Sequence, residues 1–189
     1  MLQTAANSTV SDAAARTSLY LVALSSSLVA MGFASRSRGV FVPFAAIVLP
    51  AMFVLGIFTI VRLVDSALEN MRCLTGIARI RAYYRTLTPE AGVYSAARRG
   101  RWPEASSEPS LGLGLFVALF TTSASMIAVI NSVVAGTGVA ILASDVLTDH
   151  RTVIAVTLGA VVALILIAAF FAYERWRLKV FDSLTAEEE

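Results

Sequence analysis

Three residue types that build reactive or metal-binding sites are almost missing from this 189-residue chain, which has one cysteine, one histidine and one lysine. The single cysteine, Cys73, excludes an intrachain disulfide and any zinc site built from several cysteines. The single lysine, Lys179, follows the last apolar stretch, so a chromophore attached to a lysine within a membrane is not expected. The net charge of +2 is too small to indicate a nucleic-acid partner.

The sequence also lacks the patterns of known catalytic centres. It contains no G-x-x-x-x-G-K-[ST], no G-x-S-x-G, no H-E-x-x-H and no Rossmann glycine pattern. No Asp, Glu, Lys or Arg lies deep within an apolar stretch, whereas proton-coupled pumps and voltage sensors need such charges. We therefore expect neither enzymatic activity nor a bound cofactor.

One group of possible metal ligands precedes the fourth apolar stretch. Asp145, Asp149 and His150 could together hold an ion, although a divalent site would need further ligands, for example from a neighbouring subunit. The alternative is a polar loop that caps the two flanking helices. We therefore do not expect one chain to form a metal site by itself.

Long apolar stretches are what the chain does contain. Hydrophobic residues make up 57% of it, and the mean hydropathy of +0.75 is too high for a soluble domain of this length. Four stretches are long enough to cross a membrane as helices. They lie at about residues 18–35, 41–62, 111–143 and 152–173. The predicted fold is one all-α integral membrane domain with four transmembrane helices. Residues 1–15 before the first of them are expected to fray or to lie at the membrane interface.

The second apolar stretch continues without a helix breaker into a charged segment. Apolar residues recur every three or four positions over residues 63–87, which predicts an amphipathic helix. A helix from Pro43 to Tyr84 would be roughly 63 Å long, about twice the ~30 Å thickness of a membrane core. The second helix is therefore predicted to extend into the cytoplasm, before a linker over residues 88–110.

The amphipathic segment has an apolar side that needs a covering surface. Within one chain, only residues 89–99 and 176–181 are expected to be close enough to cover it. Because these two segments are short, the amphipathic helix is predicted to associate with the same helix of a second copy. The predicted oligomer stripe consists of Val64, Leu68, Met71, Leu74 and Ile77. Charged residues at the membrane exit form either an ion-pair ladder within the helix or, in an oligomer, a ring at the mouth of a pore. They are Arg62, Asp65, Glu69 and Arg72.

The third and fourth apolar stretches carry small residues at intervals of four. Gly136 belongs to such a series in the third stretch and Gly159 to one in the fourth. Small residues let helix backbones approach closely in lipid, so the two helices are predicted to pack as a close hairpin. The third stretch also has a mildly polar face, which serves either interhelical hydrogen bonds or the lining of a pore between subunits. Its members are Thr121, Ser125, Asn131 and Ser132.

Lysine and arginine are distributed unevenly between the two sides of the predicted spans. The side with both termini and the amphipathic segment carries 12 of them, whereas the other carries Arg36, Arg38 and Arg151. The positive-inside rule places the richer side in the cytoplasm. In the linker, a basic group either lies on anionic lipid headgroups or forms a solvated loop. It consists of Arg98, Arg99 and Arg101.

A run in the second helix resembles a group of small integral membrane proteins of actinobacteria. The resemblance rests on Arg62-Leu63-Val64, Glu69 and Ile77-Ala78-Arg79-Ile80-Arg81-Ala82-Tyr83-Tyr84. It covers about residues 16–85, and the excess of arginine over lysine is typical of such high-GC sources. The resemblance implies four spans and a bacterial inner membrane, and it implies no activity.

Two functions of different classes are compatible with these features. The first is a channel-like homo-oligomer that conducts ions or small solutes, with the cytoplasmic helix as its stalk or gate. The second is a non-conducting scaffold or accessory protein that recruits a partner through the same helix. Ion flux through the purified protein in liposomes distinguishes the two.

Overall fold

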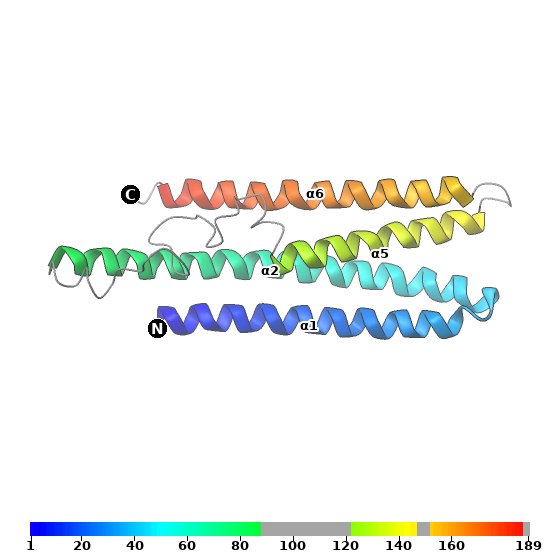
Figure 1. Cartoon of the computed structure of the whole chain (residues 1–189), viewed down its shortest axis with the longest axis horizontal. Helices are drawn as coiled ribbons and strands as arrows, with labels where there is room; N and C mark the ends of the chain where they lie inside the picture. Colours follow the sequence, from blue (N-terminus) through cyan, green and yellow to red (C-terminus); the bar gives the residue numbers. More distant parts are fainter. Residues whose placement is uncertain (88–121, 147–151, 187–189) are drawn as a thin grey trace.

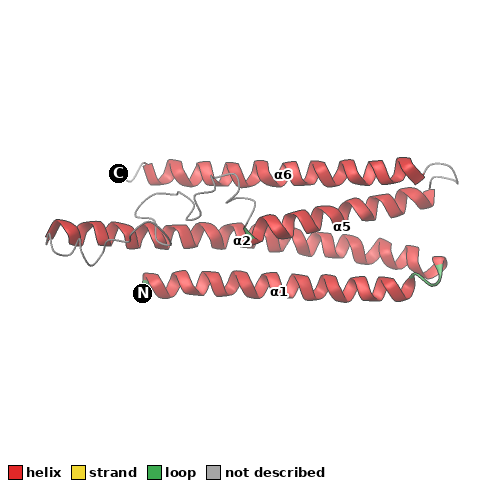
Figure 2. Ribbon diagram, viewed as in Figure 1, coloured by secondary structure: helices red, strands yellow, loops and turns green. Residues whose placement is uncertain are grey.

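The computed structural model describes residues 1–87, 122–146 and 152–186, and in these ranges every regular element is an α-helix (Figure 2). The helices are α1 (Leu2–Ala34), α2 (Arg38–Leu87), α5 (Ser123–Val146) and α6 (Thr152–Ala186). Each of the four is long and apolar enough to cross a membrane. The expectation of an all-α chain with four candidate spans is therefore confirmed for the described residues. The predicted linker with its three arginines lies outside them.

The helices lie antiparallel to their neighbours in a row (Figure 1). Helix α1 packs along α2, α2 packs against α5, and α5 packs along α6. The start of α1 and the end of α6 lie at one end of the row, called here the terminal end. The turn between α1 and α2 lies at the opposite end, the loop end. Helix α2 reaches beyond both neighbouring chain ends at the terminal end (Figure 1).

Helix α1 begins at Leu2, so the first residues are helical and the alternative that they fray is wrong. The segment is rich in alanine, the residue with the highest helix propensity. Within it, Arg16 donates a hydrogen bond to Asp12 one turn earlier, at 2.8 Å. A Cβ atom built at Gly76 of α2 would lie 3.4 Å from the side chain of Leu2. The first turns of α1 therefore pack on the charged half of α2, and this contact stabilises them.

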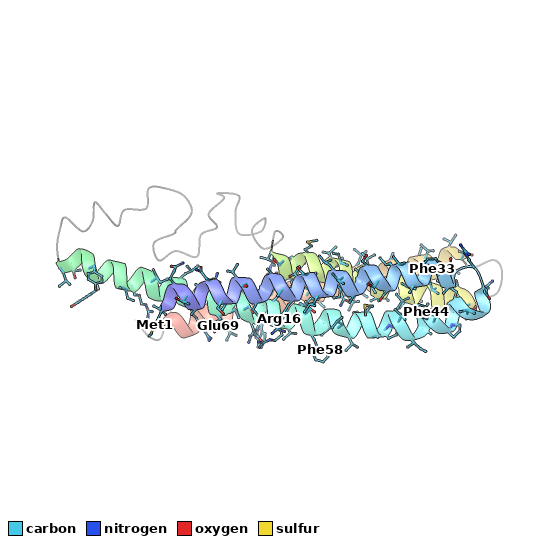
Figure 3. The ribbon with its side chains drawn as sticks, turned by 90° about the horizontal axis from the view of Figure 1, so that it is seen from below. Met1, Arg16, Phe33, Phe44, Phe58 and Glu69 are labelled. Carbon is cyan, nitrogen blue, oxygen red and sulfur yellow. The ribbon has the colours of Figure 1, made fainter. Side chains whose placement is uncertain are left out.

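Helix α2 is one continuous element of 50 residues, which corresponds to roughly 75 Å. Helix α1 of the same chain covers the apolar stripe of α2 over the length that the two helices share. Figure 3 shows the start of this overlap, where Met1 of α1 and Glu69 of α2 lie at the same end. The expectation that only residues 89–99 and 176–181 could cover the stripe was wrong, because α1 starts four turns earlier than predicted. The stripe residues are buried or half-buried: Val64, Leu68, Met71, Leu74 and Ile77.

The predicted hairpin between the last two spans is confirmed. A Cβ atom at Gly136 would lie 2.9 Å from Cβ of Ala163, and one at Gly159 would lie 2.9 Å from Cβ of Ala140. Helix α5 runs through the Gly-Thr-Gly sequence at 136–138 without a break. The two backbones approach so closely because neither helix has a side chain at the crossing.

The hydrophobic core lies in the half of the row nearest the terminal end, where all four helices contribute. Tyr20 and Ile127 are the largest fully buried side chains of this cluster. Its other buried members are Leu63, Val64, Leu68, Ala124, Ala128 and Phe170.

Candidate functional site

Asn131 links three helices through its side-chain amide and is only 2% exposed. Its Oδ1 accepts a hydrogen bond from the hydroxyl of Tyr20 in α1 at 3.3 Å. Its Nδ2 donates to the backbone oxygen of Phe53 in α2 at 3.2 Å. Both ends of the amide are therefore used inside the subunit, as an interhelical polar contact requires in an apolar surrounding.

The amide fits into this position because α2 has no side chain where the two helices meet. A Cβ atom at Gly56 would overlap the side chain of Asn131, with Nδ2 at 2.7 Å. Gly56 is itself buried. The hydrogen bonds of Asn131 therefore depend on a glycine one turn from Phe53 along α2.

The other members of the predicted polar face also point into the subunit. Ser132 is 4% exposed and donates to the Ala128 carbonyl oxygen at 2.7 Å. Ser125 is 1% exposed, and its hydroxyl lies 2.7 Å from that of Thr122. Thr121 lies outside the described residues. The described members of this face therefore lie in the interior of the chain.

One of the four charges at the predicted membrane exit has a partner on another helix. Asp65 is paired across the bundle with Arg177 of α6, which neither the ladder nor the ring anticipated. The side chains of Arg62, Glu69 and Arg72 are exposed. Asp65 therefore links α2 to α6, and the ladder and the ring stay predictions.

At the loop end, Asp145 lies near the start of α2. Its carboxylate is 3.5 Å from Arg38, and both side chains are well exposed, so the pair contributes little stability. Asp149 and His150, the other expected ligands, lie outside the described residues. Among the residues that the structure describes, no group of three or more potential metal-ligating side chains occurs.

A cavity of about 390 Å³ lies between the helices at the terminal end, next to the Asp65–Arg177 pair. Its wall is mainly apolar, and Glu174 of α6 is the one acidic residue among the described residues that line it. Glu174 is 7% exposed, and its Oε2 atom has no hydrogen-bond partner in the described part of the chain. A buried carboxylate in an apolar wall is costly unless something pairs with it.

A second candidate surface is the end of α2, where the helix passes the start of α1. Four large side chains recur there at helical intervals of three and four, which places them on one side of the helix. They are exposed by 48% to 63%: Ile80, Tyr83, Tyr84 and Leu87. The rings of Tyr83 and Tyr84 lie edge to face, with centroids 6.3 Å apart. We call these four residues the tip stripe.

No protein-family model, curated protein or solved structure matches the chain. The resemblance to actinobacterial membrane proteins therefore stays a prediction.

Glu174 is not among the predicted site residues, although the sequence pattern around it indicates that its side chain is buried. The small-residue series of α6 passes through Ala163, and the same helical side continues through Phe170 to Glu174 and Arg177. A carboxylate on the packing side of an apolar helix is expected to be buried. Arg177 lies on the same side of the helix, and the structure places it against Asp65.

Proposed function

We propose that the chain is a multi-pass protein of a bacterial inner membrane, with the terminal end in the cytoplasm. The charge-free stretches of α2 and α6, residues 39–61 and 152–173, are each roughly 33–35 Å long as helices. This length matches a membrane core of ~30 Å. The excess of lysine and arginine at the terminal end supports the orientation.

We further propose that the protein is a non-conducting scaffold that binds a partner protein through the tip stripe. The observation that carries this proposal is the exposure of two tyrosines, an isoleucine and a leucine on one side of α2, beyond the end of α1. Clustered large apolar side chains on a surface mark interaction sites. Tyrosine in particular supplies contact area and a hydrogen-bonding group together.

The charge of this segment defines the chemistry of the partner. The sequence from Asn70 to Leu87 contains four arginines and no acidic residue. Two copies of such a segment side by side in one membrane would repel each other, which disfavours self-association through the tip. Leu87 lies 25 residues beyond Arg62, or roughly 37 Å along the helix, several times the ~8 Å Debye length. An acidic protein therefore fits better than a second copy or the membrane surface.

The conducting homo-oligomer, the other function expected from the sequence, has less support. Its pore was to be lined by the polar face of α5, and the described members of that face lie within the subunit with their groups hydrogen-bonded. Its oligomer stripe is covered by α1 as far as Gly76. Beyond Gly76, α2 exposes the tip stripe.

A photo-crosslinker at the tip tests the scaffold. We expect benzoylphenylalanine in place of Tyr84 to give, on irradiation of intact cells, one adduct with a second protein whose crosslinked segment is acidic. The adduct should disappear when Ile80 and Leu87 are both changed to aspartate, because the apolar contact is lost. Gel shift and mass spectrometry of the adduct provide the measurement.

The control position for this crosslink is Phe58, which is 65% exposed and points away from the bundle at the level of the charge-free stretch (Figure 3). It should give no protein adduct because it faces lipid. An adduct between two copies of this chain at residue 84, or no adduct there, contradicts the proposal. Ion flux through the purified protein in liposomes would also overturn it.

The proposed orientation predicts which positions a membrane-impermeant thiol reagent reaches. In a Cys73→Ser background, Ser37→Cys at the loop end should label in intact spheroplasts, because it would face the outside. Thr86→Cys near the end of α2 should label only after lysis. Both native side chains are exposed, so access to the reagent depends on the side of the membrane alone. The reverse pattern would invert the topology.

A further inference from the structure

One side of α2 is covered by α1 and becomes exposed where α1 ends. A Cβ atom built at Gly76 would lie 3.4 Å from the side chain of Leu2, the first residue of α1. Six residues earlier on α2, Asn70 lines the cavity at the terminal end together with Thr9 of α1. The buried residues between these two levels are Cys73 of α2 and Ala6 of α1. The two antiparallel helices are therefore in contact along α2 up to Gly76.

The tip stripe lies on this same side of α2. Three of its four residues each follow a buried or half-buried residue by seven positions, which is two helical turns and brings the side chain back to within ~20°. The pairs are Cys73 and Ile80, Gly76 and Tyr83, and Ile77 and Tyr84. Cys73 is 9% exposed, whereas Ile80 is 48% exposed and Tyr83 63%. The pattern of α2 continues past Gly76, and only the covering helix ends there.

A helix fits this surface better than an extended strand. Because the N–H groups of a helix beyond its first turn are bonded within it, α2 offers no edge for the backbone of a strand. Side chains that recur at intervals of three and four are instead contacted by a second helix, whose own side chains fit between them. Helix α1 already does this before Gly76. A further helix in line with α1 would therefore continue an existing interface.

Charge and direction restrict the helix further. The sequence from Asn70 to Leu87 contains four arginines and no acidic residue, so acidic side chains are expected at the edges of the apolar side of the incoming helix. The N-terminus of α1 has no side-chain cap and no acidic residue in its first turn, and its free N–H groups carry partial positive charge. A helix in line with α1 is favoured when it meets this end with its own negative C-terminal end. It then runs antiparallel to α2.

We propose that the partner protein presents an acidic amphipathic helix, which lies along the tip stripe in line with α1 and antiparallel to α2. This inference rests on the scaffold function proposed above and specifies the element that the tip stripe binds. The exposed length from Gly76 to Leu87 is roughly 17 Å. The contact therefore involves about three turns of the partner's helix.

A crosslinking scan tests the helix and its direction. Benzoylphenylalanine replaces Ile80, Tyr84 or Leu87 in turn, and the adducts formed in intact cells are mapped by mass spectrometry. We expect contacts three or four positions apart in one partner segment, in reverse order, with the contact of Leu87 earlier in the partner's sequence than that of Ile80. An adduct with an acidic protein whose contacts fall at intervals of two, in several segments or in the same order as α2 would overturn this inference and leave the scaffold standing.

A second measurement does not require the partner's identity. Helix α1 is extended before Met1 by about 11 residues, enough to reach Leu87, with leucines on the side that faces the tip stripe and glutamates at its edges. This extension should remove the adduct at residue 84, because it covers the tip stripe within the chain. A control extension of the same composition, with the leucines spread around the helix, should leave the adduct in place.

The two extensions also separate this inference from the scaffold proposal. If both extensions remove the adduct, or neither does, the partner does not lie as a helix in line with α1, and the inference is overturned. If the chain without an extension gives no adduct at residue 84, the scaffold proposal itself fails, and this inference fails with it.

Discussion

Replacing Gly159 by leucine is expected to lower the melting temperature, Tm, of the detergent-solubilised protein by about 6–12 °C. A Cβ atom alone would lie 2.9 Å from Cβ of Ala140 and closer still to the backbone oxygen of Gly136. Because a backbone cannot rotate away as a side chain does, α5 and α6 have to separate. Overpacking of this kind costs about 3 kcal/mol, and each kcal/mol shifts Tm by about 2–4 °C in a protein of this size.

The reciprocal change, Gly136→Leu, should have an effect of the same size, since its Cβ would meet Ala163 at 2.9 Å. Gly32→Leu in α1 is the matched control, because no atom lies within 4 Å of a Cβ built there. Differential scanning fluorimetry on the three variants gives the comparison. If Gly32→Leu lowers Tm as much as the other two, the close crossing of α5 and α6 does not determine stability.

The α5–α6 hairpin could be predicted from the sequence because both of its determinants are local. The charge-free length gives the helix, and the interval of four between small residues gives the side that packs. A short connection between two long helices makes them antiparallel neighbours. Gly136 and Gly159 can therefore be identified from the sequence alone.

The packing of α1 on the charged half of α2 could not be predicted in the same way. The first 15 residues contain few large apolar side chains, so a pattern of apolar intervals is missing there. Their helix depends on alanine content, on the Asp12–Arg16 pair and on the neighbouring α2. The last of these is a tertiary effect, which becomes visible only when Leu2 is found next to Gly76.

The residues that make the polar contacts could be predicted from the sequence, but the partner of each residue could not. Asn131 was identified as a polar group within an apolar helix, yet its partner Tyr20 is 111 positions away. Asp65 was assigned to a set within α2, whereas its partner Arg177 is 112 positions away. The spacing of residues along one helix shows which of them are neighbours on that helix. Which residues pair between two helices depends on how the helices are shifted and rotated relative to each other.

The second large effect is expected at Gly56, where Gly56→Ala should lower the free energy of unfolding by about 2 kcal/mol. The new methyl group would occupy the space of the Asn131 amide and displace it from Tyr20 and from the Phe53 carbonyl. Asn131→Ala should cost about 1 kcal/mol, because such interhelical hydrogen bonds are each worth about 0.6 kcal/mol in membrane proteins. The double variant should be less destabilised than the sum of the two, since the methyl group then meets no amide.

A double-mutant cycle on unfolding in mixed micelles measures this coupling, which we expect to be about 1–2 kcal/mol. Gly76→Ala provides the control cycle on the same helix, because its Cβ would make an ordinary contact of 3.4 Å with Leu2 and lies far along α2 from Asn131. That change should be neutral or stabilising, and its effect should add to that of Asn131→Ala. If Gly56→Ala is also additive with Asn131→Ala, the amide does not occupy the position above Gly56, and the three-helix polar contact would have to be abandoned.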